Sequence, residues 1–462
     1  MNQPPWFWDK SKPIEYFLLL SDFKQMKILL VKENNRWGLP HFTPKYTEST
    51  KVQYIVKEVN NRLGADTIFI RCARHRYDPV LGQQDRVYVL NILSDKIDSK
   101  IEHIWAGRDY VERLIFEIPD HQEIIRNWFM EYQSANVPDM RVPWANVNWH
   151  SDVLTWISDR LVENKFSMKG PVAQMKTWPL SNVLTVETSR GKVYFKAPAP
   201  FMSIEAKAIK QLSEYYPDIV PKPIALDEDL GWTLTKDYGS TYLQNISDIE
   251  IWEGAARVLA DFHKSNIPRV EEWLALGYPD RNLRRLVIQV DPLISLGAAM
   301  LGGVPWGLSE ENISNLRSLS MRLKLMCAQL SSYKVPHTLI HGDIGGNVVF
   351  DDMEFRVFDW TDICISHPFF DLTTFVDTIF DPLNKEIDVL ELKEKTKLAY
   401  LQEWVEYEPM ERLLEAYEIS KTLGPLHQAA TYAWIVTNCS EDSRFELGGG
   451  LALWLKNVLR SV

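Results

Sequence analysis

The sequence predicts an α+β fold with more than one domain. Segments typical of buried strands, mixed with a few helical segments, extend to about Tyr238, whereas the pattern from about Ile249 onward is mainly helical. A chain of 462 residues exceeds the size of one ordinary hydrophobic core, so two or three domains are expected. A strand-rich region followed by a helical region predicts two lobes with a cleft between them.

The composition is that of an ordinary globular protein. Hydrophobic residues make up 45% of the chain and charged residues 24%. The net charge of −11 argues against a general nucleic-acid binder, because neutralising phosphates requires a basic surface. The same charge is compatible with a cationic small-molecule partner.

Cysteine usage and the N-terminal segment predict a cytoplasmic protein. The four cysteines, Cys72, Cys327, Cys364 and Cys439, lie far apart and show neither a CxxC pair nor zinc-ligand spacing. We therefore expect reduced and mostly buried thiols. Met1–Lys12 has no apolar signal core, and no apolar run reaches the roughly 18 residues that a membrane span needs.

Residues 1–133 form a predicted α/β unit. The apolar runs Tyr16–Leu20 and Met26–Val31 predict two buried strands joined by a polar turn. Apolar residues at helical spacing from Glu48 to Leu63 predict a helix, and Gly64 lies where a helix C-cap belongs. Further strands are expected at Thr67–Cys72 and Asp85–Leu93, and a second helix at about His121–Gln133.

A polar, proline-bearing stretch, residues 134–150, is the predicted linker to the rest of the chain. Residues 151–239 then form a predicted small lobe, and residues 240–462 a helical large lobe. The elements expected in the small lobe are a helix at Ser151–Glu163, a hairpin of Met175–Thr188 and Lys192–Ala197, a helix at Glu205–Tyr216 and a strand at Gly231–Tyr238.

The segment from Leu339 to Trp360 carries the strongest functional signal. It predicts strands around a tight polar loop that holds Asp343 and Asn347, with Asp359 at the end of the following strand. Phosphoryl transfer from a nucleotide needs an acid or base at the acceptor hydroxyl and oxygen ligands for Mg²⁺. Asp343 would be the carboxylate that orients or deprotonates the acceptor hydroxyl. Asn347 and Asp359 would be the magnesium ligands. The alternative is a solvated aspartate in an ordinary turn.

The motifs His341–Asp343, Asn347 and Asp359–Trp360 resemble the signature of the aminoglycoside phosphotransferase and choline kinase family. The resemblance covers about residues 152–462 and implies a bilobal, protein-kinase-like fold. The family usually has four residues between the Asp and the Asn, whereas this chain has only Ile344–Gly346. Two of these three are glycines, which reach positive φ at low cost and can help a shorter loop to close.

The resemblance also implies a nucleotide site in the small lobe. In the family a strand lysine neutralises the nucleotide phosphates and a helix glutamate holds it, which assigns these roles to Lys196 and Glu205. Ser181 and Asn182 lie where the family covers the phosphates, although such a pair can equally cap a turn. Asp237 lies in the connector that runs along the nucleotide base. ATP and GTP both remain open as the donor.

The acceptor site is expected on the later helices. Carboxylates there would bind ammonium groups and an aromatic ring would add cation–π attraction, whereas the alternative is a solvated helix face. The candidates are Asp377, Asp381, Glu403, Glu406, Trp434 and Glu441. Aminoglycosides, amino alcohols, amino acids and sugars all remain open as substrates. Asp371 and His341 are expected to hold the loop in place rather than to react.

The N-terminal unit resembles a Nudix domain. Trp37–Pro40 matches the Trp-x-Leu-Pro entry of that family, and Lys57–Gly64 lies where its helix carries magnesium-binding glutamates. Glu58 is present, but Asn61 and Arg62 occupy two other glutamate positions, and an arginine there opposes cation binding. The resemblance therefore implies a Nudix-like α/β/α fold without hydrolase chemistry.

Three functions are compatible with these patterns. The first is an ATP- or GTP-dependent, magnesium-dependent O-phosphotransferase that acts on a small-molecule hydroxyl. The second is a catalytically weak, pseudokinase-like binding or regulatory protein, which would bind magnesium and nucleotide without turnover. The third is Nudix hydrolysis, which would survive Asp343→Ala but not Glu58→Gln.

Overall fold

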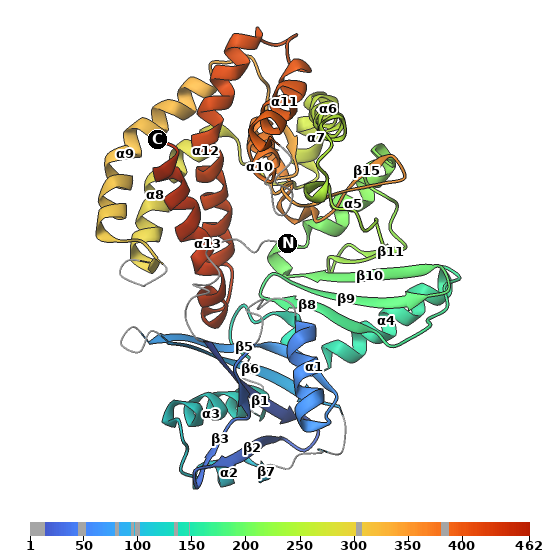
Figure 1. Ribbon diagram of the computed structural model, residues 1–462, viewed down its shortest axis with the longest axis vertical. Coiled ribbons are helices and arrows are strands. Elements are labelled where there is room, and N and C mark those ends of the chain that lie inside the picture. The colour runs from blue at the N-terminus through green and yellow to red at the C-terminus, as the bar shows by residue number, and fades with distance from the viewer. Residues whose placement is uncertain are drawn as a thin grey trace.

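The computed structural model describes residues 14–44, 52–78, 83–93, 97, 102–133, 137–146, 148–301, 307–379 and 388–462. The N-terminal domain is built on a seven-stranded mixed sheet, with the path β3-β2-β1-β6-β5, β4 beside β1 and β7 beside β2 (Figure 1). Its elements are β1 (Ile14–Asp22), β2 (Lys27–Glu33), β3 (Arg36–Gly38), β4 (His41–Phe42), α1 (Val52–Leu63), β5 (Thr67–Asp78), β6 (Gln83–Ile92), β7 (His103–Ala106), α2 (Arg108–Val111) and α3 (Pro119–Gln133).

Each face of this sheet is covered by a helix. On β1, Leu19 belongs to a core that includes Trp128 of α3, whereas its neighbour Leu18 belongs to a core that includes Val59 of α1. Successive side chains of a strand point to opposite faces, which produces the two cores. This layering agrees with the predicted α/β/α arrangement. Glu48, where the first helix is predicted to begin, lies outside the described residues.

The small lobe is a five-stranded antiparallel sheet in the order β11-β12-β10-β9-β8. Helix α4 packs against it through Trp149, Val153 and Ile157. The elements are η1 (Pro143–Ala145), α4 (Trp149–Glu163), β8 (Ala173–Trp178), β9 (Ser181–Thr188), β10 (Gly191–Pro198), η2 (Pro200–Met202), α5 (Ile204–Tyr215), β11 (Ala225–Asp227) and β12 (Trp232–Lys236).

The predicted linker, residues 134–150, is in part a component of this lobe. Trp144 and Trp149 are 3% and 7% exposed and belong to the small-lobe core, and α4 already begins at Trp149. Two tryptophans bury enough apolar surface to hold a polar, proline-bearing segment against the sheet. Residues 134–136 and 147 lie outside the described part of the chain.

The large lobe is mainly helical (Figure 1), and it also holds two small two-stranded sheets. Strand β13 pairs with β16, and β14 pairs with β15. The elements are η3 (Leu243–Asn245), α6 (Ile249–Asn266), η4 (Ile267–Arg269), α7 (Val270–Ala275), α8 (Leu283–Leu301), α9 (Glu310–Leu330), β13 (Thr338–Ile340), β14 (Val348–Asp351), β15 (Glu354–Val357), η5 (Trp360–Asp362), β16 (Cys364–Ser366), α10 (Phe369–Asp377), α11 (Val389–Gln402), α12 (Met410–Thr437) and α13 (Glu441–Arg460).

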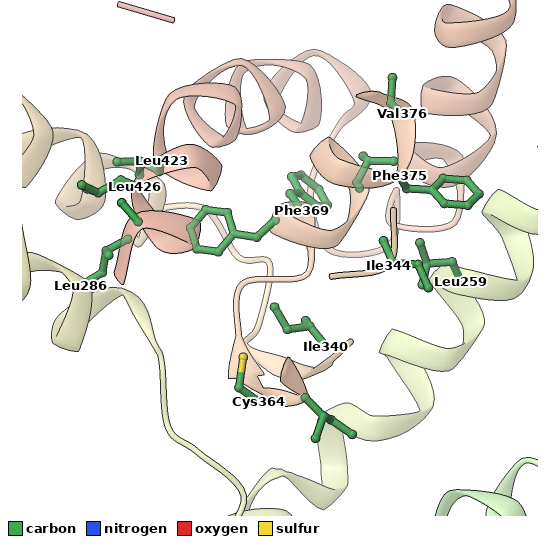
Figure 2. Close-up of a cluster of buried hydrophobic side chains, with 14 of the residues drawn as sticks. Leu259, Leu286, Ile340, Ile344, Cys364, Phe369, Phe375, Val376, Leu423 and Leu426 are labelled. Carbon is green, nitrogen blue, oxygen red and sulfur yellow. The ribbon is translucent and has the colours of Figure 1, made fainter. Parts of the chain in front are cut away.

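The loop that carries Asp343 is anchored in the core on both sides. Ile340 and Ile344 are 0% and 1% exposed, and Ile344 lies beside Leu259 of α6 and Phe375 of α10 (Figure 2). Apolar anchors of this kind hold a polar loop at the surface of a packed core, because the interior does not yield easily. The segment that carries Asp343 therefore stands on the core of the helical lobe.

The N-terminal domain contacts both lobes. The Gln174 side chain of β8 hydrogen-bonds the backbone of Phe69 in β5 through both of its polar atoms, at 2.8 and 2.9 Å. Residues of β5, the Trp178–Pro179 turn and Glu446 of α13 line one small cavity where the three parts meet. In the part of the chain that the structure describes, no helix is long and apolar enough to cross a membrane.

Candidate active site

Asp371 fixes the backbone at the entry to the loop that carries Asp343. Its carboxylate accepts hydrogen bonds from the backbone N–H groups of His341 at 2.7 Å and Gly342 at 2.9 Å, and it contacts His263 at 3.2 Å. Asp371 is 1% exposed, and a buried carboxylate of this kind needs such donors. Despite burial, the neighbouring His263 and these donors hold the pKa of Asp371 below its usual range. These bonds agree with the bracing role expected for Asp371.

His341 serves the loop as a neutral ring. Its Nδ1 accepts a hydrogen bond from the backbone N–H of Asp343 at 3.2 Å, and its Nε2 lies 3.0 Å from the carbonyl oxygen of Phe358. Nε2 therefore carries the proton and donates it to that carbonyl. Burial lowers the pKa of His341, which keeps the ring uncharged. The ring joins the loop to the strand that leads to Asp359.

Gly342 gives the loop its turn. Its φ is +84°, and a Cβ atom at this position would lie 2.3 Å from the carbonyl oxygen of Asp362. Both the conformation and the close approach require glycine. Gln428 of α12 donates to the Gly342 carbonyl oxygen at 2.6 Å, so both polar groups of this residue are held.

Asp343 itself faces solvent from this rigid loop. Among the residues that the structure describes, no hydrogen-bond donor is recorded for its carboxylate, whereas its backbone N–H and carbonyl are both bonded. The surrounding protein and the carboxylates of Asp362 and Asp359 raise the pKa of Asp343 well above its usual range. A carboxylate held in place, without a protein donor and with raised proton affinity has the properties of a general base.

Lys196, Glu205 and Asp359 converge across the cleft between the lobes. The Lys196 ammonium lies 2.7 Å from the Glu205 carboxylate and 2.6 Å from that of Asp359. Lys196 comes from β10, Glu205 from the first turn of α5, and Asp359 from the residue before η5. Thr361 also donates to Asp359 at 2.7 Å. Three residues singled out in the sequence thus form one cluster.

The charges in this cluster are strongly coupled. Burial opposes ionisation of Asp359, but the ammonium groups of Lys196 and Lys176 outweigh burial and hold the pKa of Asp359 well below its usual range. For Lys196, the two carboxylates overcome burial and raise its pKa. Burial raises the pKa of Glu205, against the opposing effect of Lys196. Asp359 is therefore the firmly ionised member, as a metal ligand must be.

Asn347 closes the short loop from within. Its Nδ2 donates to the Asp343 carbonyl oxygen at 2.7 Å, and its backbone N–H donates to the Ile344 carbonyl oxygen at 3.1 Å. Of the two loop glycines, Gly346 takes a positive φ of +82°. The amide nitrogen of Asn347 is thus engaged within the loop. The amide oxygen is the atom of this side chain that could bind a cation.

Ser181 and Asn182 lie at the start of β9, directly after the Pro179–Leu180 turn. The Ser181 hydroxyl accepts a hydrogen bond from the indole N–H of Trp178 at 2.8 Å, and the Asn182 amide donates to the Thr177 hydroxyl at 3.1 Å. Both side chains are buried, at 4% and 1% exposure. They hold the β8–β9 turn in shape.

Asp237 lies on the exposed connector between the lobes, where its carboxylate accepts from the Gly239 N–H at 3.1 Å. The connector is tied to the large lobe by Asp351, which accepts from the Ser240 N–H at 2.7 Å and the Thr241 hydroxyl at 2.8 Å. Gly239 has a φ of +133°, and a Cβ atom there would collide with Asp351. The conformation of the connector is thus set by contacts that the sequence pattern does not reveal.

A family model described as the phosphotransferase enzyme family, APH, matches residues 181–413, half of the chain. The chain belongs to this family. It is an APH-type phosphotransferase, an enzyme of the small-molecule kinase class, and its family region has an α+β fold. The N-terminal domain lies outside the match, and no family is assigned to it.

Solved structures of similar fold share little sequence with this phosphotransferase. Macrolide 2'-phosphotransferase type I is 14% identical, with 66% of this chain and 97% of that one covered and a TM-score of 0.46. The choline kinase of Cryptosporidium parvum Iowa II is 13% identical, with 67% and 96% covered and a TM-score of 0.46. APH(2")-IIia, in complex with GDP and kanamycin, is 14% identical, with 67% and 99% covered and a TM-score of 0.45. A search of curated proteins found no match.

The residues expected at the acceptor site of the phosphotransferase differ in their surroundings. Glu406 pairs with Lys264 at 2.8 Å while 61% exposed, which is the behaviour of a solvated helix face. Trp434 lies under the guanidinium of Arg281, 5.4 Å from the ring centroid. Burial raises the pKa of Asp377. Glu403 and Glu441 lie at the end of α11 and the start of α13, and Asp381 lies outside the described residues.

Sequence reasoning missed three groups near Asp343. Asp362 lies in η5, close enough to raise the pKa of Asp343, and its own pKa is raised by burial. Arg281 approaches Asp362 to 4.0 Å and donates to the Thr431 hydroxyl at 2.8 Å. The charge of Lys176 in β8 lowers the pKa of both Asp343 and Asp359, although the other groups around Asp343 raise its pKa overall. Asp362 follows the Asp-Trp motif directly, a signal that was available, whereas Arg281 and Lys176 have no local motif.

Proposed function

We propose that this protein is a magnesium-dependent O-phosphotransferase that moves the terminal phosphoryl group of ATP or GTP to a hydroxyl of a small molecule. The convergence of Lys196, Glu205 and Asp359 is the observation that carries this proposal. Residues from three separate elements meet at one point with the charges that a nucleotide triphosphate and its cation require. A lysine at an ordinary surface position is not expected to bridge two carboxylates from different elements.

Asp343 would accept the proton of the acceptor hydroxyl. As the acceptor oxygen forms its bond to the terminal phosphorus, the bond from that phosphorus to the bridging oxygen breaks and the nucleoside diphosphate leaves. The raised pKa of Asp343 supports this role, because a stronger base takes the hydroxyl proton more readily. Asp371 and His341 would position the base through the loop backbone.

Lys196, held by Glu205, would neutralise the nucleotide phosphates. Asn347 and Asp359 would hold Mg²⁺, and their amide and carboxylate oxygens are the donors that Mg²⁺ prefers. Phosphate and water oxygens would complete the coordination of the ion. When bound, Mg²⁺ would neutralise charge that develops on the phosphates.

Ser181 and Asn182 would shape the β8–β9 turn so that its backbone amides cover the phosphates. Asp237 would hold the connector, through Gly239, in the path along which main-chain groups meet the nucleotide base. The acceptor would reach Asp343 from the side of Asp362 and Tyr432. Because Asp343 and Asp362 are both carboxylates there, an acceptor that carries an amine fits this side best.

The N-terminal domain is proposed to be Nudix-like without hydrolase chemistry. The Glu58 carboxylate, which would have to bind a metal ion, lies 2.6 Å from the Arg62 guanidinium. Arg62 also lies over the Phe42 ring, 5.3 Å from the centroid. A carboxylate that already pairs with an arginine one helical turn away is a poor magnesium site.

A catalytically weak pseudokinase-like protein is the second candidate. The short loop favours it, because Asn347 uses its amide to close that loop against the Asp343 carbonyl oxygen. Binding of magnesium and nucleotide without any turnover would identify this function.

The test is a screen for acceptor-dependent release of ADP or GDP over amines with hydroxyl groups, amino acids and sugars. Asp343→Asn should lower turnover at least about 100-fold and leave nucleotide affinity nearly unchanged, because Asp343 meets the acceptor. Asp229→Asn, an exposed aspartate between β11 and β12, is the matched control. Full turnover in Asp343→Asn would remove Asp343 from its role.

A further inference from the structure

Three neighbouring strands of the small lobe place a second lysine beside Lys196. Lys176 of β8 pairs with Val183 of β9, and Val183 pairs in turn with Lys196 of β10. Directly paired residues of adjacent antiparallel strands project from the same face of a sheet. Lys176 therefore lies on the face from which Lys196 reaches Asp359, with two strand spacings, about 10 Å, between the two backbones.

A β-bulge gives Lys176 this direction. Gln174 pairs with Leu184 and Lys176 with Val183, which leaves Met175 as an extra residue in β8. In a regular strand Gln174 and Lys176 would share one face. With the bulge, Gln174 lies opposite Leu184, which belongs to the core under α4, and Lys176 lies on the cleft face. Bulges beside active sites commonly redirect a side chain in this way.

The N-terminal domain binds Gln174, the residue that precedes the bulge. The Gln174 side chain accepts from the Phe69 N–H at 2.8 Å and donates to the Phe69 carbonyl oxygen at 2.9 Å. This two-point bond ties β8 to β5 of the neighbouring domain at the residue before the extra one. The direction of Lys176 is thus linked to the docking of the N-terminal domain.

Burial lowers the pKa of Lys176, whose ammonium group lies over an aromatic ring. Its Nζ lies 4.1 Å from the ring centroid of Trp178, and among the described residues it forms no ion pair within 4.0 Å. Lys196, by contrast, is compensated by two carboxylates. Lys176 helps to lower the pKa of Asp359 and opposes the rise in the pKa of Asp343, so its ammonium lies within electrostatic reach of both.

We propose that Lys176 is a second phosphate-binding lysine, one that contacts the terminal phosphoryl group on its way from the nucleotide to the acceptor. This inference rests on the function proposed above. The transferred group must pass between the residue that holds the cation, Asp359, and the residue that meets the acceptor, Asp343. A cation within electrostatic reach of both would stabilise the charge spread over the oxygens of that group.

The alternative is a lysine that only packs on Trp178. A cation–π contact stabilises a fold but does not distinguish one nucleotide from another. The two roles therefore differ in one measurable respect. A lysine that touches the terminal phosphate affects a nucleoside triphosphate and not the diphosphate, whereas a packing lysine affects both or neither.

The experiment is calorimetric titration of the full-length protein, in the presence of magnesium, with ADP and with the β,γ-imido analogue of ATP. The guanine counterparts replace them if the wild type prefers guanine. The variants are Lys176→Met, Lys176→Arg and the control Lys192→Met, an exposed lysine on β10 of the same sheet, paired with Glu187. Melting temperatures of the unliganded variants confirm that each one folds.

Lys176→Met should weaken binding of the triphosphate analogue about tenfold or more, since a charge-assisted bond is lost, and change ADP binding less than about twofold. Lys176→Arg should restore most of the loss, and Lys192→Met should match the wild type. Equal losses for both nucleotides, or no loss for the triphosphate analogue, would overturn the inference. A wild type that binds neither nucleotide would instead overturn the proposed function, and this inference with it.

Discussion

The ammonium of Lys196 lies 2.6 Å from the carboxylate of Asp359, although 163 residues separate them in the chain. One residue belongs to the β-sheet lobe and the other to the helical lobe, so this pair joins the two sides of the cleft. Glu205 fixes the lysine from the small-lobe side at 2.7 Å. Lys196, which is proposed to bind the nucleotide phosphates, therefore lies directly beside Asp359, which is proposed to bind the cation.

Asp371→Ala should destabilise the protein strongly. It removes the acceptor for the N–H groups of His341 and Gly342 and leaves these buried groups unpaired. Two lost bonds to a charged acceptor amount to about 3 kcal/mol or more of unfolding free energy. Denaturant unfolding of Asp371→Ala and of Asp229→Ala, an exposed aspartate between β11 and β12, measures the difference. Equal midpoints would show that the brace is not needed.

Asp343→Asn should raise the melting temperature at neutral pH although it lowers turnover. The pKa of Asp343 is raised in the folded protein, so the folded state holds this proton more tightly than the unfolded chain. Stability therefore falls as the pH rises from the unfolded pKa, about 3.9, through the raised folded pKa. The variant lacks this penalty, and its advantage should vanish below about pH 4. A melting series from pH 3.5 to 8 tests this, and an advantage that persists at the acidic end would contradict it.

Asp351→Ala should weaken nucleotide binding without regard to the number of phosphates. The Asp351 carboxylate holds the connector through Ser240 and Thr241, and this contact with Thr241 lowers its pKa. If the loosened connector costs about 1 kcal/mol of binding free energy, both ADP and a triphosphate analogue should bind roughly fivefold more weakly. A loss confined to the triphosphate would contradict the hinge role. This pattern is the opposite of the one expected for Lys176→Met.

Gln174→Ala should loosen the N-terminal domain from the small lobe. The variant leaves the Phe69 N–H and carbonyl without their partner, which costs about 1–3 kcal/mol. Limited proteolysis and thermal unfolding should show a less stable N-terminal domain. Gln53→Ala, an exposed glutamine on α1, provides the control and should behave as wild type. Identical behaviour of the two variants would exclude Gln174 as a docking contact.

The sequence predicts well what is local. Asp343, Asn347 and Asp359 lie within one short segment, and the spacing of Lys196 and Glu205 follows from a strand that leads into a helix. Apolar periodicity was sufficient to place most strands and helices, because burial of one face dictates the period. The sequence predicts that helix α4 begins at Ser151, whereas it begins at Trp149, because the two tryptophans that anchor it lie in a stretch that otherwise resembles a linker.

The rest depends on contacts between distant parts of the chain. The direction of Lys176 depends on the register of β8 against β9 and on one extra residue, which no local pattern indicates. Arg281 reaches Asp362 across 81 positions, and Asp351 reaches Ser240 across 111. The bond between Gln174 and Phe69 likewise joins two domains. Such pairs emerge only once the sheets and helices are assembled.

The most direct test of the central claim is the thermal shift produced by ATP or GTP, with and without magnesium, in the wild type and in Asp359→Asn. A ligand at about 100 times its Kd adds about 2.7 kcal/mol to the stability of the folded state. We predict a magnesium-dependent rise in melting temperature for the wild type and the control Asp229→Asn, and its loss in Asp359→Asn. No rise in the wild type with either nucleotide, or an undiminished rise in Asp359→Asn, would contradict the nucleotide site described above.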